Sequence, residues 1–255
     1  MKSFESIITR IRPRFHYYMA RIAERVEKED FMSVLIENMT IKRGRKKIID
    51  GLGLSIMDGE IVALVAPNGT GKTTLLNGIA HLLPVTYRKL EINSFSPHSL
   101  NFNRSFFYLE SSNNLFEHLT ILDHLLLIKK NWQSKIAIDE VISLLKIHKY
   151  QTLPIKKMSL GMKQHALLAT YLISDAPVLL FDEPLNGLDP GSIELTNTII
   201  QNLAYKKKII LFSSHDIANI QAICNRVLFL KNGKIARDTK NMNEILALYK
   251  QLYGG

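Results

Sequence analysis

The sequence has one cysteine, Cys224, in its 255 residues, so an internal disulfide is excluded. It also lacks long apolar runs: the stretches at 178–181 and 209–212 are far shorter than the roughly 20 residues that a helix needs to cross a bilayer. Charged residues interrupt the first 30 positions every few residues, which argues against a secretory signal peptide. We therefore expect a globular protein that stays in the cytosol and carries no membrane span.

Acidic residues are in the minority: 23 aspartates and glutamates stand against 33 lysines and arginines, which gives a formal charge of +10. This excess is compatible with nucleic acid, an anionic lipid surface or a phosphorylated ligand as partner, and charge alone does not choose among them. The basic clusters at 42–47 and 206–208 are typical of solvated turns. With 46% hydrophobic residues, the chain can bury a sizeable core.

Residues 1–32 are predicted to form a basic amphipathic N-terminal extension ahead of a main domain at 33–255. Apolar residues recur near the helical period from Phe4 to Val26, which predicts one or two helices interrupted at Pro13. Arginines and aromatic residues are interleaved along the segment. This composition fits a helix on an anionic membrane surface, and it equally fits a helix whose apolar stripe packs on protein.

Strands and helices are predicted to alternate over most of the remaining chain, which is the pattern of an α/β fold with a largely parallel sheet covered on both faces. The buried strands are expected at 61–65, 178–182 and 208–214. A hairpin with an Asn-Gly turn is expected at 226–237, and short strands over 45–60. Between 119 and 149 the apolar spacing becomes three and four, which predicts two helices within a helical subdomain over about 112–160.

A glycine-rich loop follows the predicted strand at 61–65 and opens a helix, with the sequence PNGTGKTT from Pro67. In a phosphate-binding loop of the form G-x-x-x-x-G-K-[ST], backbone N–H groups and the helix N-terminus surround the phosphates. The lysine reaches the β- and γ-phosphates, and the next hydroxyl, that of Thr73, ligates Mg²⁺. The predicted nucleotide-binding residues are Asn68, Gly69, Thr70, Gly71, Lys72, Thr73 and Thr74.

Ala66 stands where the loop pattern has its first glycine. If this position needs a positive φ, alanine costs about 1–2 kcal/mol of strain; otherwise its methyl group costs almost nothing. Either cost is small beside several charge-assisted contacts to phosphate. We therefore expect nucleotide binding despite Ala66.

Two acids follow four apolar residues in the stretch VLLFDE at 178–183. Ligands bind at the C-terminal ends of the strands in open α/β sheets, so Asp182 and Glu183 are expected at such an edge. Asp182 is expected to hold Mg²⁺ through water. Glu183 is expected to orient or deprotonate an attacking water.

Three further motifs are MSLGM at 158–162, GLDP at 187–190 and SSH at 213–215. With the phosphate loop and the acidic strand, they resemble the motifs of ATP-binding cassette (ABC) ATPases in order and approximate spacing, over roughly residues 33–246. The resemblance implies a P-loop NTPase core with an antiparallel β portion, ATP as substrate and ATP hydrolysis as activity. The variant signature resembles those of ATPase subunits of ABC-2-like drug and antibiotic-peptide exporters.

The resemblance also implies a head-to-tail dimer with a second cassette, either an identical chain or a paralogue. The signature of one cassette then covers the ATP of the other, which implies a role in trans for Ser159, Leu160, Gly161 and Met162. Asp189 matches the aspartate that lies across the dimer seam. His215 matches the histidine that contacts the γ-phosphate and positions the water.

Two positions depart from the family pattern. Arg43 replaces the aromatic residue that stacks on adenine; its guanidinium plane can stack on a base, or it is a solvated turn arginine. The glutamine that reaches Mg²⁺ and the attacking water falls on Ser111, or on Glu110 if the loop shifts by one residue. Neither is glutamine, so the sequence leaves open whether hydrolysis is slowed.

The leading interpretation is an ATP-binding and ATP-hydrolysing subunit of an ABC exporter, peripheral on the inner face of the cell membrane beside a separate membrane-spanning subunit. No nucleic acid is expected as a partner. One alternative is a non-transport ABC ATPase acting on nucleic acid or ribosomes, which the charge of +10 favours. Another is a weakly hydrolysing regulatory cassette, which the missing glutamine favours and the retained Glu183 and His215 oppose.

Overall fold

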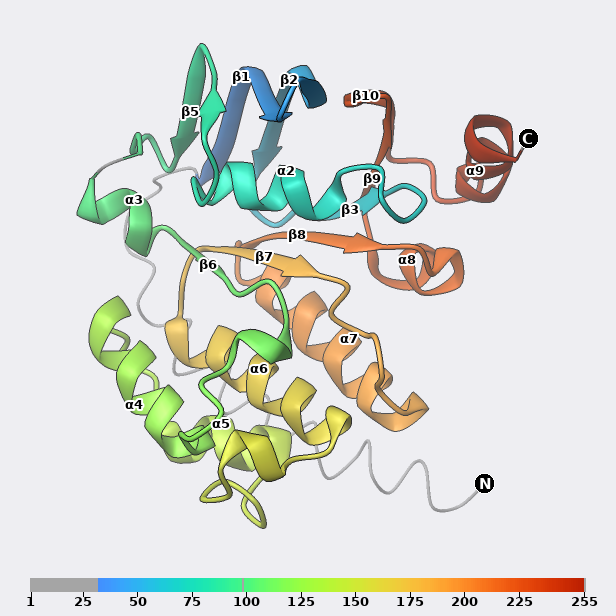
Figure 1. Ribbon diagram of the computed structural model, residues 1–255. Helices are drawn as coiled ribbons and strands as arrows, with labels where there is room; N and C mark the ends of the chain where they lie inside the picture. The colour runs from blue at the N-terminus through green and yellow to red at the C-terminus, as the bar shows by residue number, and fades with distance from the viewer. Residues whose placement is uncertain (1–31, 98, 255) are drawn as a thin grey trace.

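The computed structural model describes residues 32–97 and 99–254 (Figure 1). Apart from Met32, the predicted N-terminal extension lies outside the described residues. Within the described ranges, no helix is long and apolar enough to cross a membrane. The elements are β1 (Ser33–Arg43), β2 (Lys46–Met57), β3 (Ile61–Val65), α2 (Lys72–Ile79), β4 (Val85–Thr86), β5 (Lys89–Ile92), α3 (Leu100–Arg104), β6 (Phe106–Tyr108), the 3₁₀ turn η1 (Ser112–Asn114), α4 (Ile121–Trp132), α5 (Ile138–Leu145), the 3₁₀ turn η2 (Ile155–Lys157), α6 (Leu160–Ser174), β7 (Val178–Asp182), α7 (Pro190–Tyr205), β8 (Ile209–Ser214), α8 (Ile217–Ile223), β9 (Arg226–Lys231), β10 (Lys234–Thr239) and α9 (Ile245–Tyr253).

The larger sheet has six strands in the order β10-β9-β3-β8-β7-β6. Its pairs are parallel except β9–β10, which is the predicted hairpin. The turn residues Asn232 and Gly233 have φ values of 51° and 75°. A two-residue hairpin turn of type I′ requires a positive φ at both positions. The prediction of a largely parallel sheet is confirmed.

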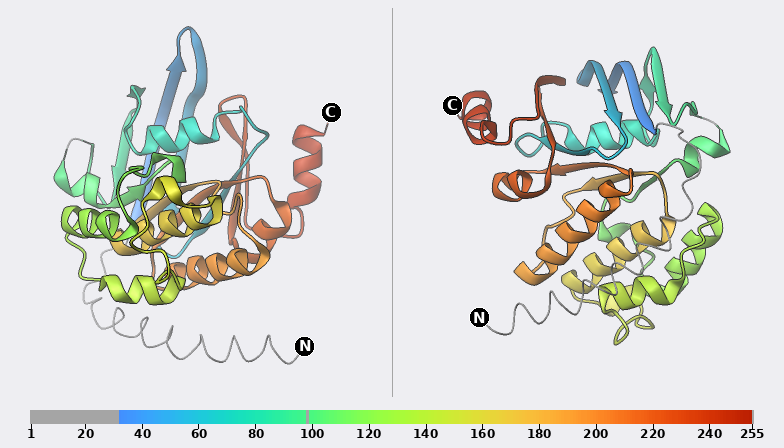
Figure 2. Two further views of the ribbon diagram at one scale, coloured as in Figure 1. Left: turned by 60° about the horizontal axis from the view of Figure 1, so that its bottom comes forward. Right: turned by 180° about the vertical axis from the view of Figure 1, so that it is seen from behind.

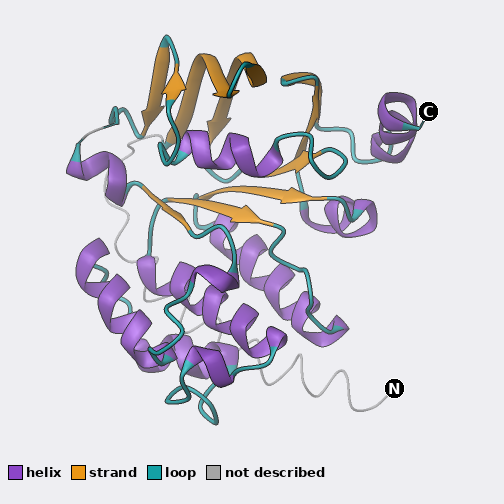
Figure 3. Cartoon of the chain, viewed as in Figure 1, coloured by secondary structure: helices purple, strands orange, loops and turns teal. Residues whose placement is uncertain are grey.

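Both faces of this sheet are buried, because alternate residues of each strand enter two different core clusters. In β3, Ala63 packs in the cluster that holds the apolar faces of α4 to α7, whereas Val62 and Leu64 pack in the cluster that holds β1, β2 and α2. Figures 1 and 3 show the same layering, with α2 on one side of the sheet and α6 and α7 on the other. The core is therefore double-sided, as the uninterrupted apolar strands predicted.

The smaller sheet is antiparallel, with the order β2-β1-β4 and β5 also pairing with β1. The expectation of several short strands over 45–60 was wrong, since β2 is one strand of 12 residues. The register between β1 and β2 shifts near Asn38 and Gly51, whose φ values are 53° and 65°. Both strands continue past these residues. Glycine inside this stretch therefore marks a local irregularity in a continuous strand.

The two helices predicted between 119 and 149 are α4 and α5. Thr120 caps α4 through a capping box with Asp123, which explains where that helix begins. Both helices pack with α6 on one side of the larger sheet, and the two views of Figure 2 show this grouping. The limits of 112–160 for a helical subdomain stay a prediction. The sequence did not predict α3, α9 or the short strands β4, β5 and β6.

Candidate active site

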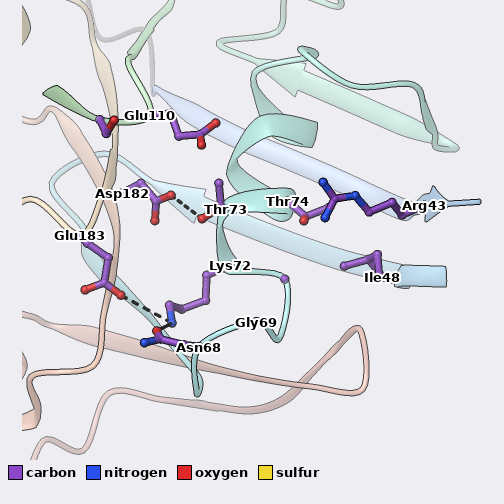
Figure 4. Close-up of a pocket in the computed structure, with 12 residues that line it drawn as sticks. Arg43, Ile48, Asn68, Gly69, Lys72, Thr73, Thr74, Glu110, Asp182 and Glu183 are labelled. Carbon is purple, nitrogen blue, oxygen red and sulfur yellow. Dashed lines mark hydrogen bonds and ion pairs between the residues drawn. The ribbon is translucent and has the colours of Figure 1, made fainter. Parts of the chain in front are cut away.

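A cavity of about 380 Å³ opens where β3 and β7 end and α2 begins (Figure 4). Its lining residues are Arg43, Ile48, Asn68, Gly69, Gly71, Lys72, Thr73, Thr74, Glu110, Ser111, Asp182 and Glu183. The fold thus brings together the phosphate loop, both acids, Arg43 and both candidates for the missing glutamine. Thr70, the other predicted binding residue of the loop, is outside this lining, and its hydroxyl donates to the carbonyl of Pro67 at 2.7 Å.

Two glycines shape the backbone of the loop. Gly69 and Gly71 have φ values of 78° and 111°, and a Cβ at Gly71 would lie 2.8 Å from a methyl carbon of Ile48. Glycine is therefore needed at position 71 for both backbone conformation and space. Gly71 also begins α2, where no side chain of the described residues caps the helix. The first N–H groups of α2 are thus left for an anion.

Ala66 is not strained, since its φ is not positive, and its methyl group is buried in the core shared with α2. Its carbonyl accepts a hydrogen bond of 2.8 Å from Nζ of Lys72. Position 66 therefore contributes a backbone acceptor that any residue supplies. Replacement of the first loop glycine by alanine leaves the loop geometry intact.

Lys72 is held under the loop with only 6% of its side chain exposed. Besides the Ala66 carbonyl, its ammonium donates to Oδ1 of Asn68 at 3.3 Å and lies 3.6 Å from Oε1 of Glu183 (Figure 4). These partners line the cavity on either side of the ammonium. The positive charge of Lys72 is therefore held at the wall of the cavity by protein groups alone.

Both carboxylate oxygens of Asp182 accept hydrogen bonds from hydroxyls. Thr73 donates to Oδ2 at 2.5 Å, and Ser213 donates to Oδ1. Ser213 is directly opposite Asp182 in the parallel pairing of β7 and β8. The sequence indicated no role for Ser213; its place at the end of the predicted strand at 208–214 was the available signal.

Magnesium fits this set of donors, because Mg²⁺ prefers hard oxygen ligands and is commonly held by one or two protein groups together with phosphate and water. Thr73 and Asp182 supply a hydroxyl and a carboxylate at the cavity wall. No cluster of three or more histidine, cysteine or acidic residues that could hold a metal occurs among residues 32–97 and 99–254. The site is therefore suited to a metal that arrives with a nucleotide.

Glu183 is held in a left-handed conformation, with φ of 50°, which is costly for a residue other than glycine. Its N–H donates to the carbonyl of Ser213 at 3.2 Å and to the hydroxyl of Ser213 at 2.9 Å. Its carboxylate lies between Lys72 and His215, whose Nδ1 is 2.9 Å from Oε2. The imidazole of His215 is 53% exposed and is not part of the cavity lining.

Tyr108, for which the sequence indicated no role, ends β6 and interacts electrostatically with Asp182 and Glu110. Its hydroxyl oxygen is buried and has no hydrogen-bond partner within the described ranges. Burial, followed by the negative charges of Asp182 and Glu110, raises the pKa of Tyr108 well above its usual range, so the phenol stays a proton donor. Glu110 itself accepts from the amide of Asn77 at 3.1 Å.

The predicted trans-acting residues are absent from the lining of this cavity. Ser159 caps α6, and its hydroxyl accepts from the N–H of Met162 at 3.3 Å. Leu160 is 55% exposed, and a Cβ on Gly161 would meet no described atom within 4 Å. Asp189 caps α7. The signature therefore forms a solvent-exposed helix N-terminus, capped by Ser159, outside the cavity that the phosphate loop lines.

The fold and the site define a P-loop ATPase. A model of the ABC transporter family matches residues 49–186, more than half of the chain, and the chain belongs to that family. An ABC transporter ATP-binding protein of Methanocaldococcus jannaschii is 31% identical over 207 residues, which cover 79% of this chain and 75% of that protein. The bacitracin transport ATP-binding protein BcrA of Bacillus licheniformis is 30% identical over 214 residues, covering 81% and 70%.

A solved structure of an ATP-binding subunit of an ABC transporter superposes with a TM-score of 0.78 at 22% identity, covering 88% of this chain and 95% of that one. This match confirms the fold. The chain is accordingly an ABC ATPase, the ATP-binding subunit whose ATP hydrolysis drives an ABC transporter. Subunits of this family dimerise and pair with transmembrane domains.

Proposed function

We propose that this chain hydrolyses MgATP for an exporter of the ABC-2-like type, at the cytoplasmic face of the membrane and beside a separate membrane-spanning subunit. The observation that carries the proposal is the convergence of Lys72, the Thr73–Asp182 pair and Glu183 on one cavity. The relationship to a bacitracin transport protein supports export, as does the variant signature.

The nucleotide is bound along the length of the cavity. The open N–H groups of α2 and the ammonium of Lys72 bind the β- and γ-phosphates, for which Lys72 exchanges its contact with Glu183. Arg43 and Ile48 line the same cavity and are placed to flank the base, with the guanidinium stacked on it. This assignment makes Arg43 a binding residue in place of the family's aromatic one.

Hydrolysis depends on the acids at the other end of the cavity. Thr73 and Asp182 would hold Mg²⁺, which when bound neutralises charge on the phosphates. Glu183 accepts a proton from the attacking water, and His215 holds that carboxylate in position through its 2.9 Å contact. We assign the role of the missing glutamine to Glu110, because the hydroxyl of Ser111 is bonded within the turn η1.

The second cassette completes the site. Its residues 159–162 supply a serine hydroxyl and helix N–H groups to the γ-phosphate, and its Asp189 lies at the seam. The solvent exposure of the N-terminus of α6 in the single chain supports this arrangement. Whether the second cassette is an identical chain is tested by the oligomer that forms with ATP.

Replacement of Glu183 by glutamine tests the chemistry. The amide keeps the size of the side chain but cannot take a proton, so hydrolysis should fall by about 10²- to 10⁴-fold while ATP binding persists. Sedimentation with MgATP should then show a stable dimer. Glu194→Gln is the matched control, because Glu194 is an exposed residue of α7. Hydrolysis at the wild-type rate in Glu183→Gln would refute the assignment of the base.

Purification from membranes tests the transport role. A polytopic membrane protein that co-purifies with the chain would support it, and accumulation of a drug or peptide in cells lacking the chain would support export. Co-purification of RNA or ribosomes without such a partner would favour the non-transport alternative, for which the charge of +10 is the motivating observation.

A further inference from the structure

A chain of three hydrogen bonds connects the helical portion of the molecule to Asp189. The hydroxyl of Tyr150 lies 2.9 Å from Nδ1 of His165, and Nε2 of His165 lies 3.1 Å from the hydroxyl of Ser192. That hydroxyl lies 2.6 Å from Oδ2 of Asp189. Tyr150 follows α5, His165 belongs to α6, and Ser192 is in the first turn of α7. Side-chain hydrogen bonds therefore join α6, α7 and the turn that follows α5.

The direction of each bond follows from the chemistry of its end. A carboxylate only accepts, so the hydroxyl of Ser192 donates to Asp189 and its oxygen accepts the N–H at Nε2 of His165. Nδ1 of the neutral ring then accepts from the hydroxyl of Tyr150. Burial lowers the pKa of His165, which favours this neutral form. All three hydrogen bonds thus donate in the same direction, from the Tyr150 phenol toward the Asp189 carboxylate.

Two further contacts fix the same loop to the same helix. Gln164, next to His165 on α6, donates to the carbonyl of Asn186 at 3.0 Å. Gly187 is packed so closely on Leu160, the first residue of α6, that a Cβ would lie 2.5 Å from its Cδ2. The loop that carries Asp189 is therefore held along α6, from the signature onward.

We propose that His165 is a positioning residue that fixes the Asp189 loop to the signature helix, so that the two surfaces that meet the second cassette move together. The proposal rests on the dimer proposed above. Asp189 is exposed, but both of its carboxylate oxygens accept hydrogen bonds from the first turn of α7. His165 bonds the buried hydroxyl in that turn to α6, and Tyr150 extends the link to the region after α5.

A matched pair of amides tests this role. In His165→Gln the side-chain nitrogen reaches the place of Nε2 and can donate to Ser192, whereas the shorter His165→Asn cannot. Both are made in the Glu183→Gln protein, and the ATP-dependent dimer is measured by sedimentation. We expect His165→Asn to weaken the dimer roughly tenfold, from loss of one buried hydrogen bond, and His165→Gln to recover most of the loss.

The affinity of the monomer for a fluorescent ATP analogue and the melting temperature separate positioning from a structural role. We expect both quantities to be similar in the two amide variants. Equal dimer affinities in His165→Asn and His165→Gln, or a parallel fall in ATP affinity and melting temperature, would overturn the proposal. Absence of any ATP-dependent dimer in Glu183→Gln itself would refute the proposed dimer and this inference with it.

Discussion

The hydroxyl of Thr73 donates a hydrogen bond of 2.5 Å to Oδ2 of Asp182, across 109 positions of sequence. Thr73 is the second residue of α2, and Asp182 is the last residue of β7. Both are oxygen donors of the kind that Mg²⁺ prefers. A cation that bound both oxygens would replace this hydrogen bond, so the proposed metal role of the pair can be tested at either residue.

Removal of the Thr73 hydroxyl should raise the Mg²⁺ requirement. Valine keeps the shape of threonine without the hydroxyl, and serine keeps the hydroxyl. We expect Thr73→Val to need roughly tenfold more Mg²⁺ for half-maximal ATP binding and hydrolysis, because one metal ligand is lost, and Thr73→Ser to remain close to wild type. Magnesium titrations with a fluorescent ATP analogue measure this difference. Identical titrations for all three proteins would argue against Thr73 as a ligand.

Lys72 and Ala66 should differ sharply in importance. Lys72→Ala removes the charge placed beside the cavity and should abolish measurable ATP binding. Ala66→Gly should leave ATP affinity within about twofold, because φ at this position is not positive, and should lower stability by about 1 kcal/mol through a lost buried methyl group and a freer unfolded chain. Equilibrium binding and urea unfolding test both. Tenfold tighter binding in Ala66→Gly would show that alanine strains the loop.

The backbone of Glu183 should store strain that glycine relieves. We expect Glu183→Gly to be about 1 kcal/mol more stable than Glu183→Ala, since glycine has no Cβ and adopts φ of 50° without steric strain. Comparison of these two variants removes the effect of the lost carboxylate. Chemical denaturation gives the free energies of unfolding. An alanine variant at least as stable as the glycine variant would show that the left-handed conformation carries no strain.

Acidification should destabilise the fold partly through His165. Burial lowers the pKa of its ring below the ordinary value of 6.5, and Asp189 only partly opposes this. The unfolded chain therefore binds more protons at this position than the folded chain. The contribution of neutral His165 to the free energy of unfolding is present above pH 6.5 and is lost as the pH falls from 6.5 through the lowered pKa. The facing hydroxyl of Tyr150 stays protonated throughout, because burial raises its pKa.

The corresponding measurement is the melting temperature between pH 7 and pH 5. We expect a smaller decrease for His165→Gln than for wild type, because glutamine does not titrate. His148→Gln, at an exposed position after α5, is the control and should follow wild type. Parallel decreases in wild type and His165→Gln would show that His165 does not contribute to the acid sensitivity.

Much of the site was predictable from the sequence because its elements are short and local. A lysine in a glycine-rich turn before a helix, and an acid directly after a buried strand, each specify their position through the backbone that carries them. Lys72 and Asp182 therefore lie at one cavity as expected. Local patterns also predicted α4, α5 and the hairpin at Asn232, where apolar spacing or turn chemistry is strong.

The residues that the sequence did not reveal depend on contacts between distant segments. Ser213 lies beside Asp182 only through the pairing of β7 with β8, and Ile48 reaches Gly71 only through the packing of β2 on the loop. β4, β5 and β6 have two, four and three residues, too few for a period to be seen. β2 continues through Gly51 because pairing with β1 compensates for its weak local preference.

The sequence by itself determined the α/β class, the phosphate loop and its lysine, and the acids at a strand end, since chain-local backbone preferences and spacing are sufficient for these. It left open whether position 66 needs a positive φ, and it gave no hydrogen-bond partners for Asp189. Only the tertiary structure decided them: Ala66 has no positive φ, and Asp189 is linked to His165 through Ser192 where α7 lies beside α6. Such contacts join groups that no local pattern relates, because they form only when the buried faces of separate elements meet.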